Sequence, residues 1–184
     1  MLETTALVVI DVQVGFEDPA WGRRDNPGCE ANVLALLDRW RTRHRPLVLV
    51  QHDSAKPGSP LGPGTAGHAL KPGVDGPADL RIHKTVHSAF HGAPALHDWL
   101  QAREIGRLVV CGITTDHCCS TTARVARDLG YTVDFVLDAT HTFDRRAPDG
   151  EVIPAETVAR VEAAALAGEF ATVRTTAQLL VEAG

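Results

Sequence analysis

Short apolar runs that alternate with helical patterns constrain the fold of this chain more than any other feature. Residues 6–10 (Ala-Leu-Val-Val-Ile) and 107–111 (Arg-Leu-Val-Val-Cys) have the nearly unbroken apolar character of strands that are buried on both faces. Further strands are expected at 47–50, 80–83, 132–137 and 170–173, of which 80–83 is a weak one. Such strands, separated by helices, predict a parallel sheet that helices cover on both faces.

Helical periodicity fills the segments between these strands. In residues 30–44 apolar residues recur at helical spacing, and Pro46 ends the pattern. Further helices are expected at 95–103, 118–129 and 154–166, with a short one at 177–181. Gly112 is expected to close its strand. The stretch between the second and third strands is rich in Pro and Gly and predicts a long loop of functional importance.

Length and charge limit the classes of function that this chain can have. Its 184 residues suffice for one core, and we expect a single domain over residues 1–184. The net charge of −5, with both signs interspersed, argues against a basic nucleic-acid-binding face. No apolar run approaches the roughly 18 residues of a membrane span. Residues 1–5 lack the features of a signal peptide. We therefore expect a cytoplasmic protein without nucleic-acid or membrane partners.

Polar residues follow the predicted strands at the edge where parallel sheets bind ligands. A thiolate is the reactive form of cysteine; a helix N-terminus or a nearby ammonium favours it, and a carboxylate can accept the thiol proton. Each residue also has a plainer role, as a turn residue, a surface charge or a packing group. Three such groups at one sheet edge nevertheless favour nucleophilic catalysis. The strand-end residues are Asp11, His52, Asp53, Lys84, Asp138 and the segment 112–118, which contains Cys118.

Three motifs at these positions resemble those of the isochorismatase-like cysteine hydrolases, and the resemblance covers nearly the whole chain. Residues 9–16 (Val-Ile-Asp-Val-Gln-Val-Gly-Phe) are similar to the family's Asp-x-Gln-x-x-Phe. Residues 84–90 (Lys-Thr-Val-His-Ser-Ala-Phe) are similar to Lys-x-x-x-Ser-x-Phe. Residues 112–119 (Gly-Ile-Thr-Thr-Asp-His-Cys-Cys) are similar to Gly-x-x-Thr-Asp-x-Cys-Val. The resemblance implies a Rossmann-like, three-layer α/β domain with a six-stranded parallel sheet in the order 3-2-1-4-5-6.

The resemblance also implies how the site would work. Asp11, Lys84 and Cys118 would form the catalytic triad. A non-proline cis peptide would join Ile113 to Thr114, and the backbone N–H groups of Thr114 and Cys118 would form an oxyanion hole. Asp11 would take the thiol proton, and the thiolate would attack a carbonyl. Asp11 would then return the proton to the leaving amine and act as base for the water that hydrolyses the thioester.

Residues beside the motifs are candidates for substrate binding. The aromatic ones could equally belong to the core, which we favour for Phe16 and Phe90, and His117 could face solvent. The candidates are Phe16, Trp21, His87, His117 and Phe143.

No cofactor or metal is expected. The nicotinamidase branch binds a metal through an Asp-x-His pair, but the loop here offers His52, Asp53 and His68 without that spacing, and whether they bind a metal stays open. Cys119 stands where the family usually has Val. We expect it to be a buried apolar side chain, with a redox partnership to Cys118 as the alternative.

The predicted function is hydrolysis of a C–N bond in a small amide, lactam or carbamoyl compound through a thioester. The resemblance places the chain near the metal-free amidohydrolases, which include streptothricin hydrolases. Two alternatives are vinyl-ether hydrolysis, as in isochorismatase itself, and a non-catalytic binding or scaffold protein that kept the fold. The resemblance implies a homo-oligomer, a dimer or a tetramer. The identity of the substrate does not follow from the sequence.

Overall fold

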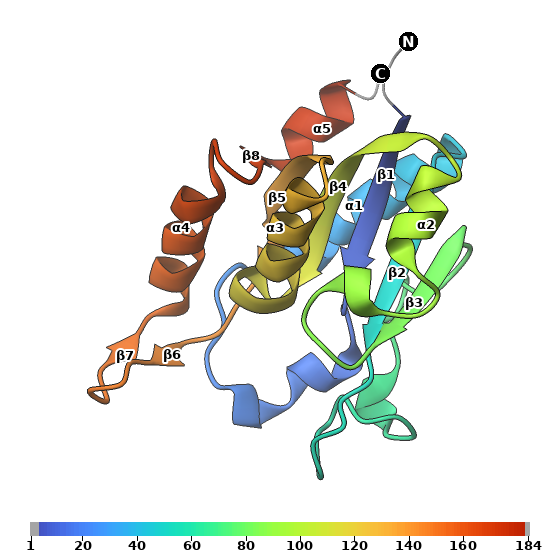
Figure 1. Ribbon diagram of the computed structural model, residues 1–184. Coiled ribbons are helices and arrows are strands. Elements are labelled where there is room, and N and C mark those ends of the chain that lie inside the picture. The colour runs from blue at the N-terminus through green and yellow to red at the C-terminus, as the bar shows by residue number, and fades with distance from the viewer. Residues whose placement is uncertain (1–3, 183–184) are drawn as a thin grey trace.

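A six-stranded parallel sheet forms the centre of the protein (Figure 1). A computed structural model describes residues 4–182. The strand order β3-β2-β1-β4-β5-β8 confirms the predicted sheet, since β8 is the sixth strand that joins it. The strands are β1 (Thr4–Ile10), β2 (Leu47–His52), β3 (Leu80–Lys84), β4 (Ile105–Ile113), β5 (Thr132–His141) and β8 (Thr172–Arg174).

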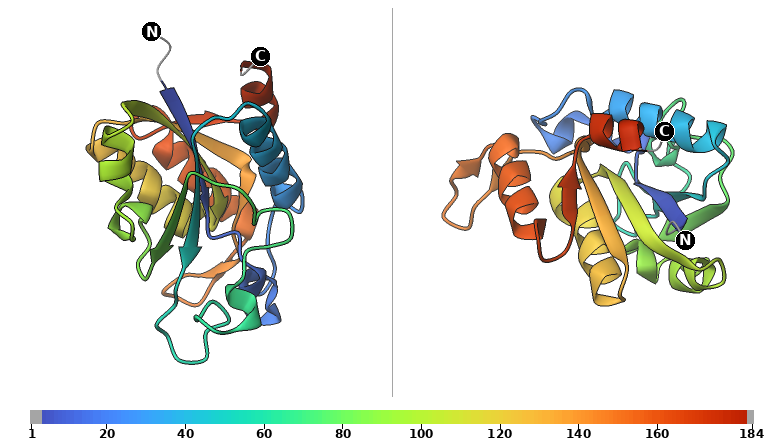
Figure 2. Two further views of the ribbon diagram at one scale, coloured as in Figure 1. Left: turned by 90° about the vertical axis from the view of Figure 1, so that its right-hand side faces the viewer. Right: turned by 90° about the horizontal axis from the view of Figure 1, so that it is seen from above.

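Helices cover both faces of the sheet (Figure 2). Along β1, alternate residues point to opposite sides: Ala6, Val8 and Ile10 join one core, and Leu7 and Val9 join the other. The first core lies under α2 (Leu96–Gln101), α3 (Ser120–Asp128) and α4 (Ala155–Leu166), and the second under α1 (Cys29–Thr42) and α5 (Thr176–Glu182). The apolar runs in the sequence are therefore strands buried on both faces, as predicted.

The fourth strand does not end at Gly112, as was expected, but continues to Ile113. Gly112 has a φ of 128°, and a Cβ at this position would lie 2.0 Å from the backbone oxygen of Ile10. The glycine is needed because β1 and β4 approach each other closely there. Gly112 thus lets the strand run on to the segment that carries Cys118.

The helix expected at 118–129 also begins differently. A π-helical turn, η5 (Thr115–Cys119), precedes α3, so Cys118 lies within this turn. Turns of this kind are rare and are frequently found at functional sites. A two-stranded antiparallel hairpin of β6 (Arg145–Arg146) and β7 (Val152–Ile153) was not predicted, and it projects from the molecule below α4 in Figure 1.

The loop between β2 and β3 folds back over the carboxyl edge of the sheet. Lys71 N–H donates to the backbone oxygen of Val12 at 2.8 Å, and Val14 N–H donates to that of Ala69 at 2.9 Å. The buried Gln13 side chain donates to the backbone oxygens of His52 and His68 at 3.2 and 2.8 Å. The loop is therefore ordered, and it contains the short 3-10 turn η3 (Ala66–His68). Three further 3-10 turns lie in other loops of the chain: η1 (Val14–Glu17), η2 (Pro19–Trp21) and η4 (Ala89–His91).

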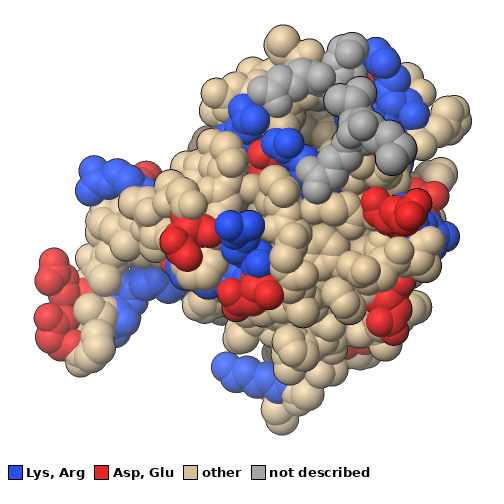
Figure 3. Space-filling view, turned by 45° about the horizontal axis from the view of Figure 1, so that its top comes forward, with Lys and Arg blue, Asp and Glu red and all other residues tan. Residues whose placement is uncertain are grey.

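Acidic and basic side chains are interspersed on the face shown in Figure 3. Among the helices of residues 4–182, none combines the length and the apolar character needed to cross a bilayer. Residues 1–3 and 183–184 lie outside the described part of the chain. The prediction that residues 1–5 do not form a signal peptide therefore falls partly on residues outside the described part.

Candidate active site

Asp11, Lys84 and Cys118 meet beneath the carboxyl edge of the sheet. Lys84 Nζ donates to Asp11 Oδ2 at 2.5 Å and to Cys118 Sγ at 3.4 Å. β1 ends just before Asp11, β3 ends at Lys84, and η5 supplies Cys118. Asp11 is 0 % exposed, whereas Cys118 keeps 7 % of its surface open to solvent. The three groups predicted from the motifs are thus in direct contact, with the carboxylate deepest.

The backbone turns sharply at Asp11. Its φ of 52° lies in the left-handed region, where non-glycine residues are strained by about 1–3 kcal/mol. Hydrogen bonds fix this turn, since Asp11 N–H donates to the Val50 oxygen at 2.9 Å and Gln13 N–H donates to the Asp11 oxygen at 2.8 Å. The strain is the cost of ending β1 with a carboxylate turned inward.

Burial dominates the electrostatics of the site. Burial and the nearby Asp11 carboxylate raise the pKa of the Cys118 thiol well above its usual value, and Lys84 opposes this only in part. Burial also raises the pKa of Asp11, although Lys84 pulls it down. Burial would lower the pKa of Lys84, but Asp11 and Cys118 outweigh it and raise that pKa. Burial therefore opposes the thiolate that a helix terminus and an ammonium would favour. A thiol that keeps its proton agrees with the scheme in which Asp11 takes the proton of Cys118.

The segment around Cys118 is tightly held. The peptide bond between Ile113 and Thr114 is cis, as the motif resemblance implies. Cys119 N–H donates to the Thr114 oxygen at 3.2 Å. Cys119 is fully buried in the core, in agreement with the prediction of an apolar role.

Arg145 anchors the same segment from the hairpin. Its guanidinium donates to both carboxylate oxygens of Asp116, at 2.8 and 3.0 Å, and Thr142 Oγ1 donates to Asp116 at 2.6 Å. Burial alone would raise the pKa of Asp116, but the bonds from Arg145 and Thr142 lower it to about 2. Sequence reasoning missed Arg145, because it lies in a short hairpin far along the chain from Asp116.

The candidate substrate-binding residues fall into two groups. Phe16, Trp21 and Phe143 form an aromatic cluster with ring centroids 5.1 to 6.3 Å apart, and Phe16 and Phe143 are buried in the core under α1. His87 and His117 instead lie at the surface, with ring centroids 5.5 Å apart. His87 Nδ1 is 3.7 Å from Cys118 Sγ. His87 therefore contacts Cys118, and His117 lies next to His87.

His52, half-buried beside the same site, was also noted in the sequence. Its Nδ1 lies 3.4 Å from Lys84 Nζ. Burial and the neighbouring Lys84 lower the pKa of His52, which favours a neutral imidazole next to the ammonium.

A separate cluster could hold a divalent cation. Oδ1 of Asp53 lies 2.7 Å from His68 Nε2 and 3.0 Å from His83 Nδ1, and the three ligand atoms lie within 4.8 Å of one another. One carboxylate and two imidazoles suit zinc, iron or manganese. Sequence analysis named Asp53 and His68 but missed His83, because a single histidine in a weak strand carries no spacing signal.

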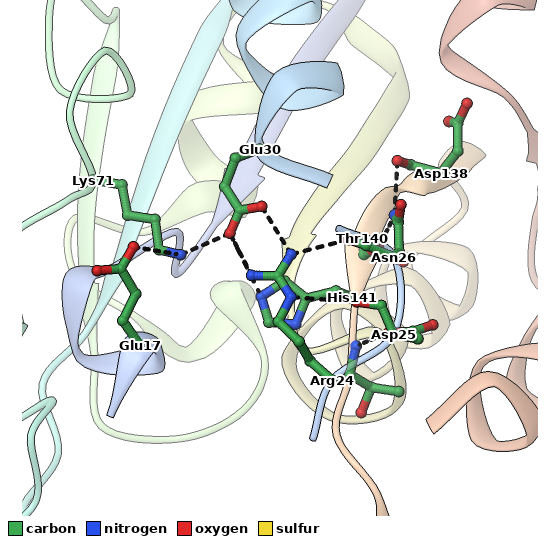
Figure 4. Close-up of polar contacts among 10 residues, drawn as sticks. Glu17, Arg24, Asp25, Asn26, Glu30, Lys71, Asp138, Thr140 and His141 are labelled. Atoms are coloured by element: carbon green, nitrogen blue, oxygen red, sulfur yellow. Dashed lines mark hydrogen bonds and ion pairs between the residues drawn. The ribbon is translucent and has the colours of Figure 1, made fainter. Parts of the chain in front are cut away.

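A second polar network lies under α1 at the same edge of the sheet (Figure 4). Glu30 accepts hydrogen bonds from Arg24 at 2.7 and 2.8 Å and from Lys71 at 2.7 Å. Burial would raise the pKa of Glu30, but these cations lower it. His141 Nε2 is 3.9 Å from Glu30, and burial holds the pKa of His141 near 3. None of these four residues was a sequence candidate.

Comparisons with known proteins agree on one family. The model of the Isochorismatase domain matches residues 5–178. The isochorismatase family protein YrdC of Bacillus subtilis is 39 % identical over 182 residues, covering 98 % of this chain and 96 % of that protein. A streptothricin hydrolase of Streptomyces noursei is 34 % identical over 89 % of this chain and 60 % of its own length. Nicotinamidase 3 of Arabidopsis thaliana is 30 % identical over 76 % of this chain and 74 % of its own length. A crystal structure of an isochorismatase family protein from Chromobacterium violaceum superposes with a TM-score of 0.92 at 36 % identity, covering 99 % and 94 % of the two chains.

Proposed function

The chain belongs to the isochorismatase family, and on this premise we propose that it cleaves a C–N bond of a small molecule through a thioester on Cys118. The contact of Cys118 with the buried Lys84–Asp11 pair carries this proposal. The streptothricin hydrolase and nicotinamidase among its relatives support a C–N bond as the target, since both names describe such hydrolases.

The acylation step follows from the resting state of the site. Because burial keeps Cys118 a neutral thiol, a base must take its proton before the sulfur can attack. Asp11 is suited to this task, since Oδ2 is held by Lys84 while Oδ1 is buried with no hydrogen-bond partner among the described residues. Asp11 takes the thiol proton, Sγ attacks the carbonyl carbon, and Lys84 stabilises the negative charge beside it. Asp11 then gives the proton to the nitrogen as the C–N bond breaks. In deacylation Asp11 takes a proton from the water that attacks the thioester and returns it to the sulfur as the C–S bond breaks.

The oxyanion formed in this step needs hydrogen-bond donors. The backbone N–H groups of Thr114 and Cys118 are proposed for this role, which rests on the resemblance of the nucleophile motif. The hydrogen bonds of Asp116 to Arg145 support it by holding the intervening backbone in one arrangement.

A metal is not required by this scheme. If Asp53, His68 and His83 bound a divalent cation, the cation would supply a Lewis acid next to the strand that ends at Lys84. Asp11, Lys84 and Cys118 would keep their proposed roles in the attack of the sulfur and the transfer of its proton. We also propose that the chain acts as one hydrolase domain in the cytoplasm and assembles as a homo-oligomer.

A screen for released ammonia or amine tests the proposal. Nicotinamide, N-carbamoyl compounds, ureides and lactam antibiotics are incubated with the wild-type protein and with Cys118→Ala as the blank. The proposal expects release from at least one class with wild type and none with Cys118→Ala. Release that is equal in both proteins, or no release above background from any class, would contradict it.

A further inference from the structure

Two threonines of the β5 terminus (residues 138–142) hold the turn that carries Cys118. Thr115 Oγ1 donates to Thr140 Oγ1 at 2.8 Å, and Thr142 Oγ1 donates to Asp116 at 2.6 Å. Thr115 and Asp116 are the first two residues of η5, and Cys118 follows in the same turn. Thr140 and Thr142 are buried, so solvent does not compete for these bonds. The position of η5 therefore depends on where the β5 terminus lies.

Pairing with β4 is interrupted just before the β5 terminus. Val110 of β4 pairs with Phe135, whereas Gly112 pairs with Thr140, so β5 has extra residues between the two pairs. An irregularity of this kind disrupts the ladder and bends the strand. Pairing resumes for the last two residues of β5. Contacts outside the ladder therefore share in holding the β5 terminus.

Asn26, in the loop before α1, supplies such contacts (Figure 4). Its side-chain Nδ2 donates to the backbone oxygens of Asp138 and Thr140 at 2.9 and 2.6 Å. Next to it, Asp25 Oδ1 accepts from Thr142 N–H at 2.7 Å, and Asp25 N–H donates to the Thr142 oxygen at 3.2 Å. The φ of Asn26 is 40°, in the left-handed region that asparagine adopts more readily than most residues. Both its backbone and its amide therefore suit this position.

Asn32, in the first turns of α1, offers a matched comparison. Its Nδ2 donates to the same Asp138 oxygen at 2.6 Å, and like Asn26 it is half-buried. Within the described residues, no hydrogen bond joins the Asn32 side chain to Thr140 or Thr142. The two asparagines thus share one contact and differ in the contact with Thr140.

We propose that Asn26 is a positioning residue for the nucleophile, and that it acts through Thr140 and Thr115. By holding the β5 terminus, it keeps η5 in the arrangement in which the N–H groups of the proposed oxyanion hole face the carbon that Cys118 attacks. This inference rests on the proposed function, because the oxyanion hole is part of that scheme. A displacement of about 1 Å in such an arrangement can cost about 100-fold in rate, so a contact remote from the sulfur can control acylation.

Two reagents that modify Cys118 separate the position of the oxyanion hole from the reactivity of the thiol. p-Nitrophenyl acetate acetylates the sulfur through a tetrahedral oxyanion, whereas methyl methanethiosulfonate forms a disulfide with it and no oxyanion. The other three cysteines are fully buried, so intact mass reports on Cys118. Both rates are measured for wild type, Asn26→Gly, Asn32→Ala and the blank Cys118→Ala. Glycine removes the amide of Asn26 and still adopts a positive φ.

We expect Asn26→Gly to be acetylated at least about 10-fold more slowly than wild type, while its reaction with methyl methanethiosulfonate stays within about threefold. Asn32→Ala should stay within about threefold of wild type in both reactions. A general loss of structure would not slow acetylation selectively. Thr115→Val breaks the same path at its other end and should show the same selective loss. It becomes the deciding variant if urea unfolding shows that Asn26→Gly is not folded.

The outcomes separate the two proposals. If wild type gains no acetyl group beyond the Cys118→Ala blank, the thioester scheme fails and this inference fails with it. If wild type is acetylated but Asn26→Gly slows both reactions equally, or neither, the thioester scheme stands and the positioning role is wrong. An equal selective loss in Asn32→Ala would also overturn the role, because the contact with Thr140 would then not be the one that matters.

Discussion

The ammonium of Lys84 lies 2.5 Å from Oδ2 of Asp11, and neither side chain has any exposed surface. A buried pair of this kind costs several kcal/mol of desolvation for each ion and is rarely a net gain in stability. Its position beside Cys118 fits the proposed chemistry, because Lys84 opposes the rise in the pKa of Asp11 that burial causes.

Replacing Lys84 with Met should therefore destabilise the protein by about 3–5 kcal/mol, because the Asp11 carboxylate would be left buried and unpaired. Urea unfolding measures this loss. The double variant Asp11→Asn/Lys84→Met removes the unpaired charge and should be more stable than Lys84→Met alone, while both variants lack turnover. A double variant no more stable than the Lys84→Met single would contradict this account of the pair.

Gly112→Ala should cost about 3 kcal/mol or more, because the new Cβ would meet the backbone oxygen of Ile10 at 2.0 Å. Gly130→Ala is the matched control, since its φ of 92° is similarly unfavourable but no atom lies within 4 Å. The control should lose only about 1–2 kcal/mol. Equal losses in thermal or urea unfolding would show that the contact between β1 and β4 is not what requires the glycine.

His141 should make stability fall in mild acid. Burial lowers its pKa in the folded protein to about 3, whereas the unfolded imidazole titrates near 6.5. Its contribution is complete above pH 6.5 and is lost as pH falls toward 3, by about 2 kcal/mol at pH 5. The difference in unfolding free energy between pH 8 and pH 5 should shrink by about that amount in His141→Leu. His91→Gln, which keeps His141, should retain the wild-type difference, and an unchanged value in His141→Leu would contradict the prediction.

Chelation should not abolish turnover. Asp53 Oδ1 already lies within hydrogen-bonding distance of both His68 and His83, so the cluster is satisfied without a cation. Dialysis against EDTA, with metal content measured before and after, checks this. Loss of turnover that follows loss of one equivalent of metal, and its return on adding the metal back, would show that the cluster is part of the active site.

Most of the fold could be predicted, because strands buried on both faces must be apolar along their length. Residues 6–10 and 107–111 show this nearly unbroken apolar character, and all six predicted strands join the sheet. The ends of strands were harder to predict. A glycine after an apolar run indicates a strand end, but β4 continues past Gly112 to Ile113. The close approach of Gly112 to Ile10 depends on the pairing of two distant segments, which the local sequence does not show.

Some residues of the site could likewise be predicted from the sequence, and others could not. Asp11, Lys84 and Cys118 were predictable, since parallel strand ends share one edge and motifs mark each residue. His83 and Arg145 were not, because their partners Asp53 and Asp116 lie 30 and 29 residues away in sequence and no local pattern links them. The raised pKa of Cys118 was also missed, because burial is a property of the folded chain.

The central claim is that Cys118 is the nucleophile. The most direct measurement is turnover by Cys118→Ala on the best substrate of the amine-release screen, relative to wild type and with folding checked by urea unfolding. The account predicts a loss of at least about 10⁴-fold in kcat/KM with little change in stability. A Cys118→Ala protein that kept wild-type turnover would contradict it.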